Sequence, residues 1–255
     1  MKKLSWNEAE ETLDTLFGGR LKILQKKSGY RFSIDALLLA HFAEPRPMDR
    51  MIDLGTGCGI IPLIIAFRKK TGKITGVEIQ PSLADLARRN AALNRLSTRI
   101  TILERDLRNL EGKGWKGNFD LVLSNPPYRK VGAGRVNPRR EKALARHEFK
   151  TTLQDVLRAA QFLLKEKGRL AMIYPASRAA ELLQEMRRFH LEPKRLQFVH
   201  SRPQEEARRM MVEGFKEGRA QVRVLPSLIL YDSLGNDTPE AQELFRSPFR
   251  NPAVA

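Results

Sequence analysis

A glycine-rich turn follows a short apolar run, and an acidic residue stands just before it. Met51–Leu54 has the character of a buried strand, and Gly55-Thr56-Gly57-Cys58-Gly59 follows directly. A strand, a glycine-rich turn and a helix in succession can hold a dinucleotide, a phosphate or S-adenosylmethionine. The spacing is G-x-G-x-G rather than G-x-G-x-x-G, and Asp53 would repel a pyrophosphate at the helix N-terminus. The turn therefore favours a ligand with a cationic portion, such as an ammonium group or a sulfonium.

Two further acidic residues follow the next two predicted strands. Glu78 ends the run 73–79, where a carboxylate can accept both hydroxyls of a ribose. Asp106 follows the run 100–103, where it can accept from an adenine amino group. Ligands of open α/β sheets bind beyond the carboxyl ends of the strands, so we expect these acids at one edge with the glycine turn. The alternative for each acid is a cap on the next helix or loop.

The sequence Asn125-Pro126-Pro127-Tyr128 follows a fourth strand-like run, Phe119–Ser124. The prolines stiffen the turn, so the carbonyl of Pro126 and the amide of Asn125 are held with little freedom. Two such acceptors on an exocyclic aromatic amine would direct its lone pair at an electrophilic methyl group, mainly by positioning and charge placement. Tyr128 would stack on the ring, worth about 1–3 kcal/mol. A simple turn that ends a strand is the alternative.

Basic residues outnumber acidic ones throughout the 255 residues. The chain has 46 Lys and Arg against 29 Asp and Glu, a formal net charge of +17. Residues 1–128 hold 21 basic and 14 acidic side chains, and residues 129–255 hold 25 and 15. The excess of positive charge is therefore not confined to a charged tail. This balance favours a polyanionic partner, with nucleic acid first and an acidic membrane surface second.

A cationic segment, residues 129–146, follows the Asn-Pro-Pro-Tyr motif. It has one acid and seven basic side chains, namely Arg129, Lys130, Arg135, Arg139, Arg140, Lys142 and Arg146. We expect a loop that holds phosphates beside a flipped base, the alternative being a solvated charged loop. A second basic stretch would extend this surface, formed by Arg202, Arg208, Arg209, Lys216 and Arg219.

Several classes of protein are excluded by composition. Cys58 is the single cysteine, so no intrachain disulfide or cysteine-based zinc cluster is expected, and the four histidines share no metal-ligand spacing. We expect no metal. Apolar stretches such as 59–67 are far shorter than the roughly 20 residues of a membrane span. The N-terminus lacks the apolar core of a signal peptide, so we expect a cytoplasmic protein without a membrane partner.

Predicted strands and helices alternate from residue 51 onward. Helices are expected at 60–70, 82–95, 153–165 and 176–189, and further strands at 169–174, 195–200 and 222–231. This alternation predicts an α/β fold with a doubly wound, mostly parallel sheet and helices on both faces.

The N-terminal part is expected to begin with a helix at 5–17 on a capping-box pattern. A hairpin of 21–25 with 30–33 and a helix at 34–43 would follow. We therefore expect an N-terminal extension, residues 1–48. Residues 49–232 would form the α/β domain and residues 233–255 a loose tail.

Together these motifs resemble the class I S-adenosylmethionine-dependent methyltransferases of the N-P-P-Y type. The resemblance is carried by D-L-G-T-G-C-G at 53–59, V-E-I-Q at 77–80, E-R-D at 104–106 and S-N-P-P-Y at 124–128. The bacterial tRNA(Val) (adenine-37) N6-methyltransferase family is more similar still, through residues 30–39, 145–148 and 213–231. The resemblance covers about residues 16–232.

The resemblance implies a seven-stranded Rossmann-like sheet with its last strands antiparallel. It implies S-adenosylmethionine as methyl donor, S-adenosylhomocysteine as product, and tRNA as the RNA partner. The target would be N6 of adenine 37 in the anticodon loop of a valine tRNA. Residues 30–39 would lie over the cofactor and help to form the substrate cleft, on which the extension 1–48 would pack. Residues 49–232 would be the methyltransferase domain.

The resemblance also assigns the site residues. The methionine moiety would be held by Asp53, Gly55 and Gly57, the ribose by Glu78 and the adenine by Asp106. Asn125 belongs to both sites, because it borders the cofactor and, with Pro126, binds the target amine on which Tyr128 stacks.

Three other functions remain open. Adenine methylation in rRNA or DNA uses the same chemistry, although sequence-specific DNA enzymes are expected to carry a target-recognition domain. Protein glutamine N5-methylation presents the same NH₂ group, but that family has an N-terminal helical domain, and about fifty residues precede Asp53. A catalytically silent RNA-binding or assembly factor is the non-enzymatic alternative, against which the intact acids and Asn125 argue.

Overall fold

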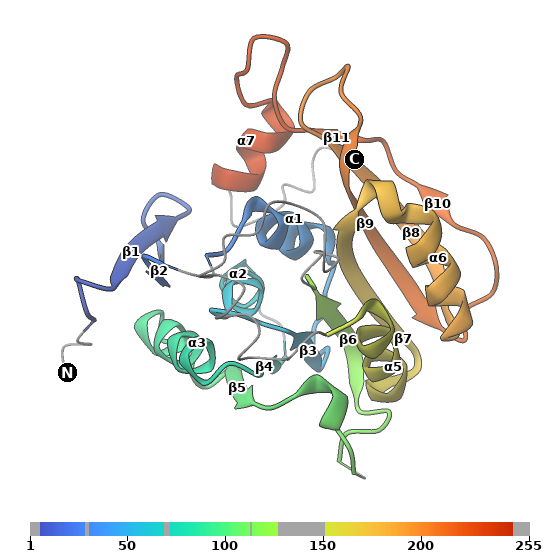
Figure 1. Ribbon diagram of the computed structural model, residues 1–255, viewed down its shortest axis with the longest axis horizontal. Coiled ribbons are helices and arrows are strands. Elements are labelled where there is room, and N and C mark those ends of the chain that lie inside the picture. Colours follow the sequence, from blue (N-terminus) through green and yellow to red (C-terminus); the bar gives the residue numbers. More distant parts are fainter. Residues whose placement is uncertain (1–5, 29–30, 69–71, 113, 127–150, 247–255) are drawn as a thin grey trace, which may run out of the picture.

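The computed structural model describes residues 6–28, 31–68, 72–112, 114–126 and 151–246. A sheet of nine strands forms its centre, and seven of them make up the body of the sheet (Figure 1). These seven are β3 (Met51–Leu54), β4 (Ile74–Glu78), β5 (Ile100–Glu104), β6 (Phe119–Ser124), β7 (Leu164–Pro175), β8 (Leu191–His200) and β9 (Ala207–Lys216).

The strands follow the spatial order β8-β9-β7-β6-β3-β4-β5. The five strands from β3 to β7 are parallel, and β9 is antiparallel to both of its neighbours, β7 and β8. The mostly parallel, doubly wound sheet is therefore confirmed. The expectation that the last strands are antiparallel needs correction. Strand β9 alone is reversed, whereas β8 runs in the same direction as the central strands.

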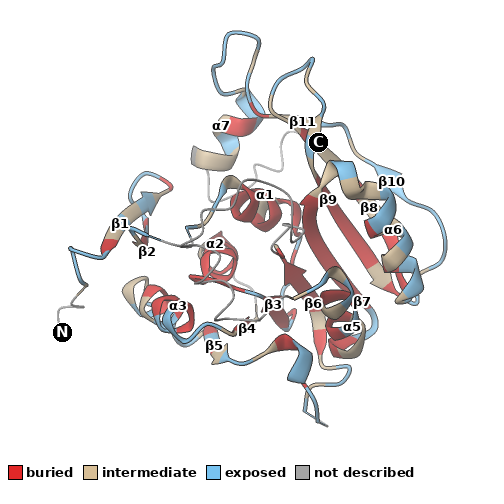
Figure 2. Ribbon diagram, in the orientation of Figure 1, coloured by how far each residue is buried: buried red, intermediate tan, exposed pale blue. Residues whose placement is uncertain are grey.

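Helices cover both faces of the sheet. One face carries α1 (Ile34–Phe42), α2 (Ile60–Arg68) and α3 (Pro81–Leu93), and the other carries α5 (Leu153–Leu163) and α6 (Ala179–Arg188). Figure 2 shows the sheet buried between the two layers.

Successive strand residues alternate between the two apolar cores that these layers form. Met51 points into one core, whereas its neighbours Ile52 and Leu54 point into the other. This is the period-2 alternation of a strand buried on both faces.

The chain folds differently from expectation before residue 30. A helix was expected at 5–17, but β1 (Glu11–Leu16) pairs antiparallel with β2 (Leu21–Lys26). The turn between them places Gly18 and Gly19 at φ values of 65° and 82°, a region that favours glycine. A glycine pair between two runs that contain apolar residues is a hairpin signal, and here it outweighs the capping-box pattern. Residues 31–33, expected as the second strand of the hairpin, form no strand.

Helices α3 and α5 begin or end away from the expected residues. The N-cap of α3 is Gln80, with Pro81 in the first turn, rather than Ser82. Proline suits that position because its missing N–H would have no partner there. Helix α5 ends at Leu163, and its C-cap Leu164 already begins β7.

The C-terminal part contains a strand that was not anticipated. Strand β9 was missed because charged residues surround its apolar run Met210–Val212. The expected strand 222–231 is instead two short strands, β10 (Arg223–Val224) and β11 (Leu228–Ile229), each parallel to β8. The expected loose tail contains a helix, α7 (Pro239–Arg246), whose Ala241 is fully buried.

Candidate active site

The glycine loop, residues 55–59, connects β3 to α2 at the carboxyl edge of the sheet. The amides of Gly55 and Thr56 both donate to the carbonyl of Val77, at 2.9 Å each, which anchors the loop to β4. Gly59 has a φ of +81°, and a Cβ on it would lie 3.1 Å from the Cβ of Ala87 in α3. Glycine is required there both for the backbone conformation and for the approach of α3.

Glu78 fixes the loop from the end of β4. Its two carboxylate oxygens accept from the amides of Gly57 and Gln80, each at 2.9 Å. The side chain is buried, and burial raises the pKa of Glu78 above its usual value. A carboxylate can accept about four hydrogen bonds, so the two from backbone amides leave capacity for ligand hydroxyls. The sequence predicted a ligand contact here and did not anticipate the bond to the glycine loop.

Asp53 is a fully buried carboxylate in the middle of this arrangement. Neither of its oxygens has a hydrogen-bond partner within the described ranges, and the same holds for the hydroxyl of Thr56 in the loop. Burial raises the pKa of Asp53 to about 7, although the nearby Thr56 hydroxyl acts to lower it, and the charge of Glu78 acts in the same direction as burial. A buried carboxylate without a partner is costly, so the site suits a ligand that brings a cation. These residues therefore fit the ammonium-bearing end of S-adenosylmethionine.

Asp106 makes the contacts of a cap. It is the N-cap of the short 3-10 turn Leu107–Asn109 and accepts from the amide of Arg108 at 2.9 Å. Its carboxylate also accepts from the Arg108 guanidinium, at 2.6 Å for Nη2. That guanidinium lowers the pKa of Asp106. The contacts seen are those of the capping alternative, and the adenine contact stays a prediction.

The Asn125–Pro126 turn lies beside the glycine loop. Ser124 is the register partner of Leu54, and its hydroxyl donates to the Leu54 carbonyl at 3.0 Å. Asn125 therefore follows β6 at the level where Gly55 follows β3. Pro126 is buried and Asn125 is half-buried. Pro127, Tyr128 and the cationic segment 129–146 lie outside the described residues.

Only some side chains of the second basic stretch lie at the surface. Lys216 is buried and donates to the carbonyls of Gln161 and Leu164, at 2.8 and 2.9 Å. Its expected role on an RNA-binding surface is therefore wrong. Arg209 pairs with Asp35 at the start of α1, with 2.8 Å between Nε and Oδ2.

Sequence reasoning missed Asn90, a fully buried residue of α3 that hydrogen-bonds the glycine loop. The available signal was a pair of asparagines four residues apart, Asn90 and Asn94, among the apolar residues of a predicted helix. Cys58 in the loop is buried, and burial raises the pKa of its thiol to about 12.

Neither a metal-binding cluster nor a membrane-spanning helix is present in the part of the chain that the structure describes. It contains no cluster of three or more His, Cys, Asp or Glu side chains able to hold a metal ion. It also contains no helix with the length and apolar character needed to cross a membrane.

Comparison with known proteins gives concordant results. A family model described as methyltransferase small domain matches residues 33–194. The chain is 32% identical to a tRNA1(Val) (adenine(37)-N6)-methyltransferase of Porphyromonas gingivalis, over 92% of this chain and 96% of the relative.

Solved structures share the fold. A predicted O-methyltransferase, Atu636 of Agrobacterium tumefaciens, is 28% identical with a TM-score of 0.66, over 85% of this chain and 99% of that one. A Streptomyces coelicolor geranyl diphosphate C-methyltransferase in complex with S-adenosyl-L-homocysteine has a TM-score of 0.51 at 15% identity, over 71% and 74% of the chains.

Proposed function

The chain belongs to the methyltransferase small-domain family and, within it, to the tRNA1(Val) (adenine(37)-N6)-methyltransferases, and from this premise we propose how its residues act on adenine 37 of a valine tRNA. It is an S-adenosylmethionine-dependent adenine-N6 methyltransferase. One observation carries the proposed site. Asp53, a buried carboxylate without a hydrogen-bond partner among the described residues, lies at the end of β3 just before a glycine loop that is held next to the Asn125–Pro126 turn.

The methyl-donor side is formed by β3 and β4. S-adenosylmethionine supplies an electrophilic methyl group on a positively charged sulfur. Asp53 would pair with its ammonium group, and Gly55 and Gly57 would let the backbone approach the methionine moiety. Glu78, with acceptor sites remaining, would bind the ribose hydroxyls, and Asp106 would accept from the adenine amino group beside its cap.

The target side is formed by the end of β6. The side-chain amide oxygen of Asn125 and the carbonyl of Pro126 would accept from the two N–H groups of the adenine amine. This draws the nitrogen toward tetrahedral geometry and directs its lone pair at the methyl group. The parallel pairing of β3 and β6 supports the arrangement, because it brings both turns to one edge. Tyr128 would stack on the purine ring.

We propose tRNA as the partner and the cationic segment 129–146 as its main phosphate contact. The seven basic side chains of that segment directly follow the target motif, and unpaired loops are the parts of RNA that expose bases. A tRNA substrate would place the protein in the cytoplasm. Residues 1–48 would act as an extension of the catalytic domain, residues 49–232.

The substrate is tested with labelled S-adenosylmethionine and four acceptors in parallel: total tRNA, total rRNA, DNA and a release factor. We expect label in tRNA alone, recovered as N6-methyladenosine after digestion to nucleosides, and mapped to adenine 37 of a valine tRNA. Label in rRNA, DNA or the release factor would instead support the corresponding alternative, and no label in any acceptor would support the non-enzymatic one.

The roles of the site residues are tested by Asn125→Ala. We expect its Kd for S-adenosylmethionine to stay within about twofold of wild type while turnover falls at least about a hundredfold, the effect typical of removing one preorganised polar contact. Asn118→Ala is a matched control, because Asn118 lies at the opposite end of β6 and contacts Arg50 and Gly114. Unchanged turnover in Asn125→Ala would remove this residue from the mechanism.

A further inference from the structure

Asn90 connects two parts of the chain that are far apart in sequence. It is fully buried in α3, and its side chain makes three hydrogen bonds. The oxygen accepts from the amide of Leu24 in β2 at 2.7 Å, and Nδ2 donates to the Leu24 carbonyl at 3.0 Å. Nδ2 also donates to the carbonyl of Cys58 in the glycine loop, at 3.0 Å. One side chain thus joins the hairpin β1–β2 to the glycine loop.

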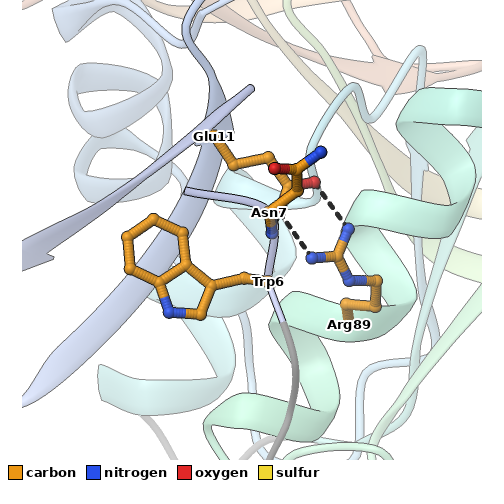
Figure 3. A pocket seen from close by; sticks show the side chains of 4 residues that line it. All are labelled: Trp6, Asn7, Glu11 and Arg89. Atoms are coloured by element: carbon orange, nitrogen blue, oxygen red, sulfur yellow. Dashed lines mark hydrogen bonds and ion pairs between the residues drawn. The ribbon is translucent and has the colours of Figure 1, made fainter. Parts of the chain in front are cut away.

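The hairpin is attached to α3 at two more places. Asn94, one helical turn beyond Asn90, accepts from the amide of Lys22 at 2.9 Å and donates to its carbonyl at 2.7 Å. The two asparagines therefore bond alternate residues of β2, as a neighbouring strand would. Arg89 forms a bidentate ion pair with Glu11 of β1, at 2.6 and 2.7 Å (Figure 3).

The Arg89–Glu11 pair and the Asn94 bonds hold the hairpin without contacting the glycine loop. The ion pair lines a shallow cavity of about 280 Å³ together with Trp6 and Asn7. The pair lowers the pKa of Glu11 and raises that of Arg89, as expected for a favourable contact. Among these attachments, Asn90 is the one that also bonds the loop.

The glycine loop is held at three successive residues from different elements. Gly57 donates to Glu78, Cys58 accepts from Asn90, and Gly59 packs against Ala87. The hydrogen bond to the Cys58 carbonyl comes from Asn90 of α3. The same side chain is held in place by its two bonds to Leu24 of the hairpin. Loss of that bond would leave a buried carbonyl without its partner and free the centre of the loop to shift.

We propose that Asn90 is a positioning residue for the methyl-donor site, through which the N-terminal hairpin sets the conformation of the glycine loop. The proposal rests on the glycine loop being the site of S-adenosylmethionine. Asn90 does not touch the donor in this account, since it acts through the Cys58 carbonyl. A hairpin that precedes the catalytic sheet in sequence is thereby part of the donor site.

The test compares two isosteric variants, Asn90→Asp within α3 and Asn94→Asp at the C-cap of the same helix. Each replaces the donating Nδ2 with an oxygen that faces backbone carbonyls, but only the first loses the bond to the glycine loop. For Asn90→Asp we expect the Kd for S-adenosylmethionine, measured by calorimetry on the full chain, to rise about tenfold. The KM for this donor should rise in parallel, while kcat at saturating donor stays within about twofold of wild type. For Asn94→Asp we expect both constants within about twofold of wild type.

Two results would overturn the proposal. One is wild-type donor affinity in Asn90→Asp, and the other is an equal loss in both variants, which would assign the effect to hairpin attachment in general. The wild-type protein is the reference for the proposed function. If wild type binds the donor and methylates RNA while Asn90→Asp does so equally well, only the positioning role fails. If wild type does not bind the donor, the proposed function itself fails.

A measurement on the wild-type chain covers the case in which Asn90→Asp does not fold. Because binding and positioning are reciprocal, S-adenosylmethionine should stabilise the Asn90 bonds. We expect the donor to slow hydrogen exchange of the Leu24 amide, which bonds Asn90, at least about fivefold more than that of the Lys22 amide, which bonds Asn94. Equal slowing of the two amides, or none at Leu24, would contradict the proposal.

Discussion

Replacing Asp53 with asparagine should make the protein more stable and a weaker binder of S-adenosylmethionine. Both effects have one cause, a carboxylate that is fully buried and has no hydrogen-bond partner among the described residues. Asparagine has nearly the same shape, but it carries no charge to be desolvated and none to pair with a ligand's ammonium group. Stability and affinity should therefore change in opposite directions.

The size of the stability gain follows from the pKa of Asp53. Burial raises it from 3.8 to about 7, and each unit is worth about 1.36 kcal/mol. The folded state holds the proton more tightly than the unfolded state, so wild-type stability falls as the pH rises from about 4 to about 7 and is level above that. The Asp53→Asn substitution should therefore add on the order of 4 kcal/mol at pH 8 and only roughly 2 kcal/mol at pH 5.

Binding of S-adenosylmethionine should depend on pH in the opposite sense. If the ionised Asp53 binds the ammonium group, a carboxyl with a pKa of about 7 by itself makes the Kd about tenfold higher at pH 6 than at pH 8. On the same acidification an amino group with a pKa near 8 goes from about half to nearly fully charged, which by itself would lower the Kd about twofold and leaves a net rise of about fivefold. A loss of affinity on acidification is therefore diagnostic of the carboxylate. In Asp53→Asn this loss of affinity on acidification should disappear. At pH 8 the variant should bind S-adenosylmethionine more weakly than wild type does.

Urea unfolding without ligand at pH 5 and pH 8, and calorimetry at pH 6 and pH 8, measure the two effects. Asp120→Asn is the control, because although partial burial acts to raise the pKa of Asp120, the bond from Lys165 helps to lower it overall. That variant should lose stability at pH 8 rather than gain it. An Asp53→Asn protein that is less stable than wild type at pH 8, or that gains equally at both pH values, would refute the reasoning.

Two further predictions concern the scaffold and the RNA. Arg169→Met should lower the free energy of unfolding by about 3–5 kcal/mol in urea, because it leaves the buried Asp49 without its cation and Glu213 with only the longer Arg195 contact. A loss below about 1 kcal/mol would contradict this. Triple replacement by alanine at Arg135, Arg139 and Arg140 should weaken tRNA binding and leave the affinity for S-adenosylmethionine unchanged. The slope of log K for tRNA against log salt concentration should fall in magnitude by about 2, at about 0.7 for each phosphate that is no longer neutralised. An unchanged slope would rule out this segment as a phosphate contact.

The edge of the sheet that carries the candidate site was predictable because its signals are local. The runs before Gly55, around Glu78 and before Asn125 are short and apolar, and each ends in a polar turn, so strand and loop follow from neighbouring residues. The parallel arrangement then brings the turns together, since strands linked by helices must run in the same direction.

Elements that depend on distant partners were not predictable in this way. Strand β9 carries Glu213 and Lys216, and charged side chains such as these predict exposed positions. Burial of Glu213 depends on Arg169 and Arg195, and burial of Lys216 depends on carbonyls of α5. Likewise, nothing near Asn90 in sequence indicates that its partners are Leu24 and Cys58. Local patterns therefore locate the chemistry, and long-range hydrogen bonds decide how it is held.

An experimental structure with bound S-adenosylhomocysteine tests the central claim most directly. We expect its ammonium group on Asp53, its ribose on Glu78, and its sulfur facing the Asn125–Pro126 turn. A sulfur that faces away from this turn, or a ligand bound outside the glycine loop, would contradict the account.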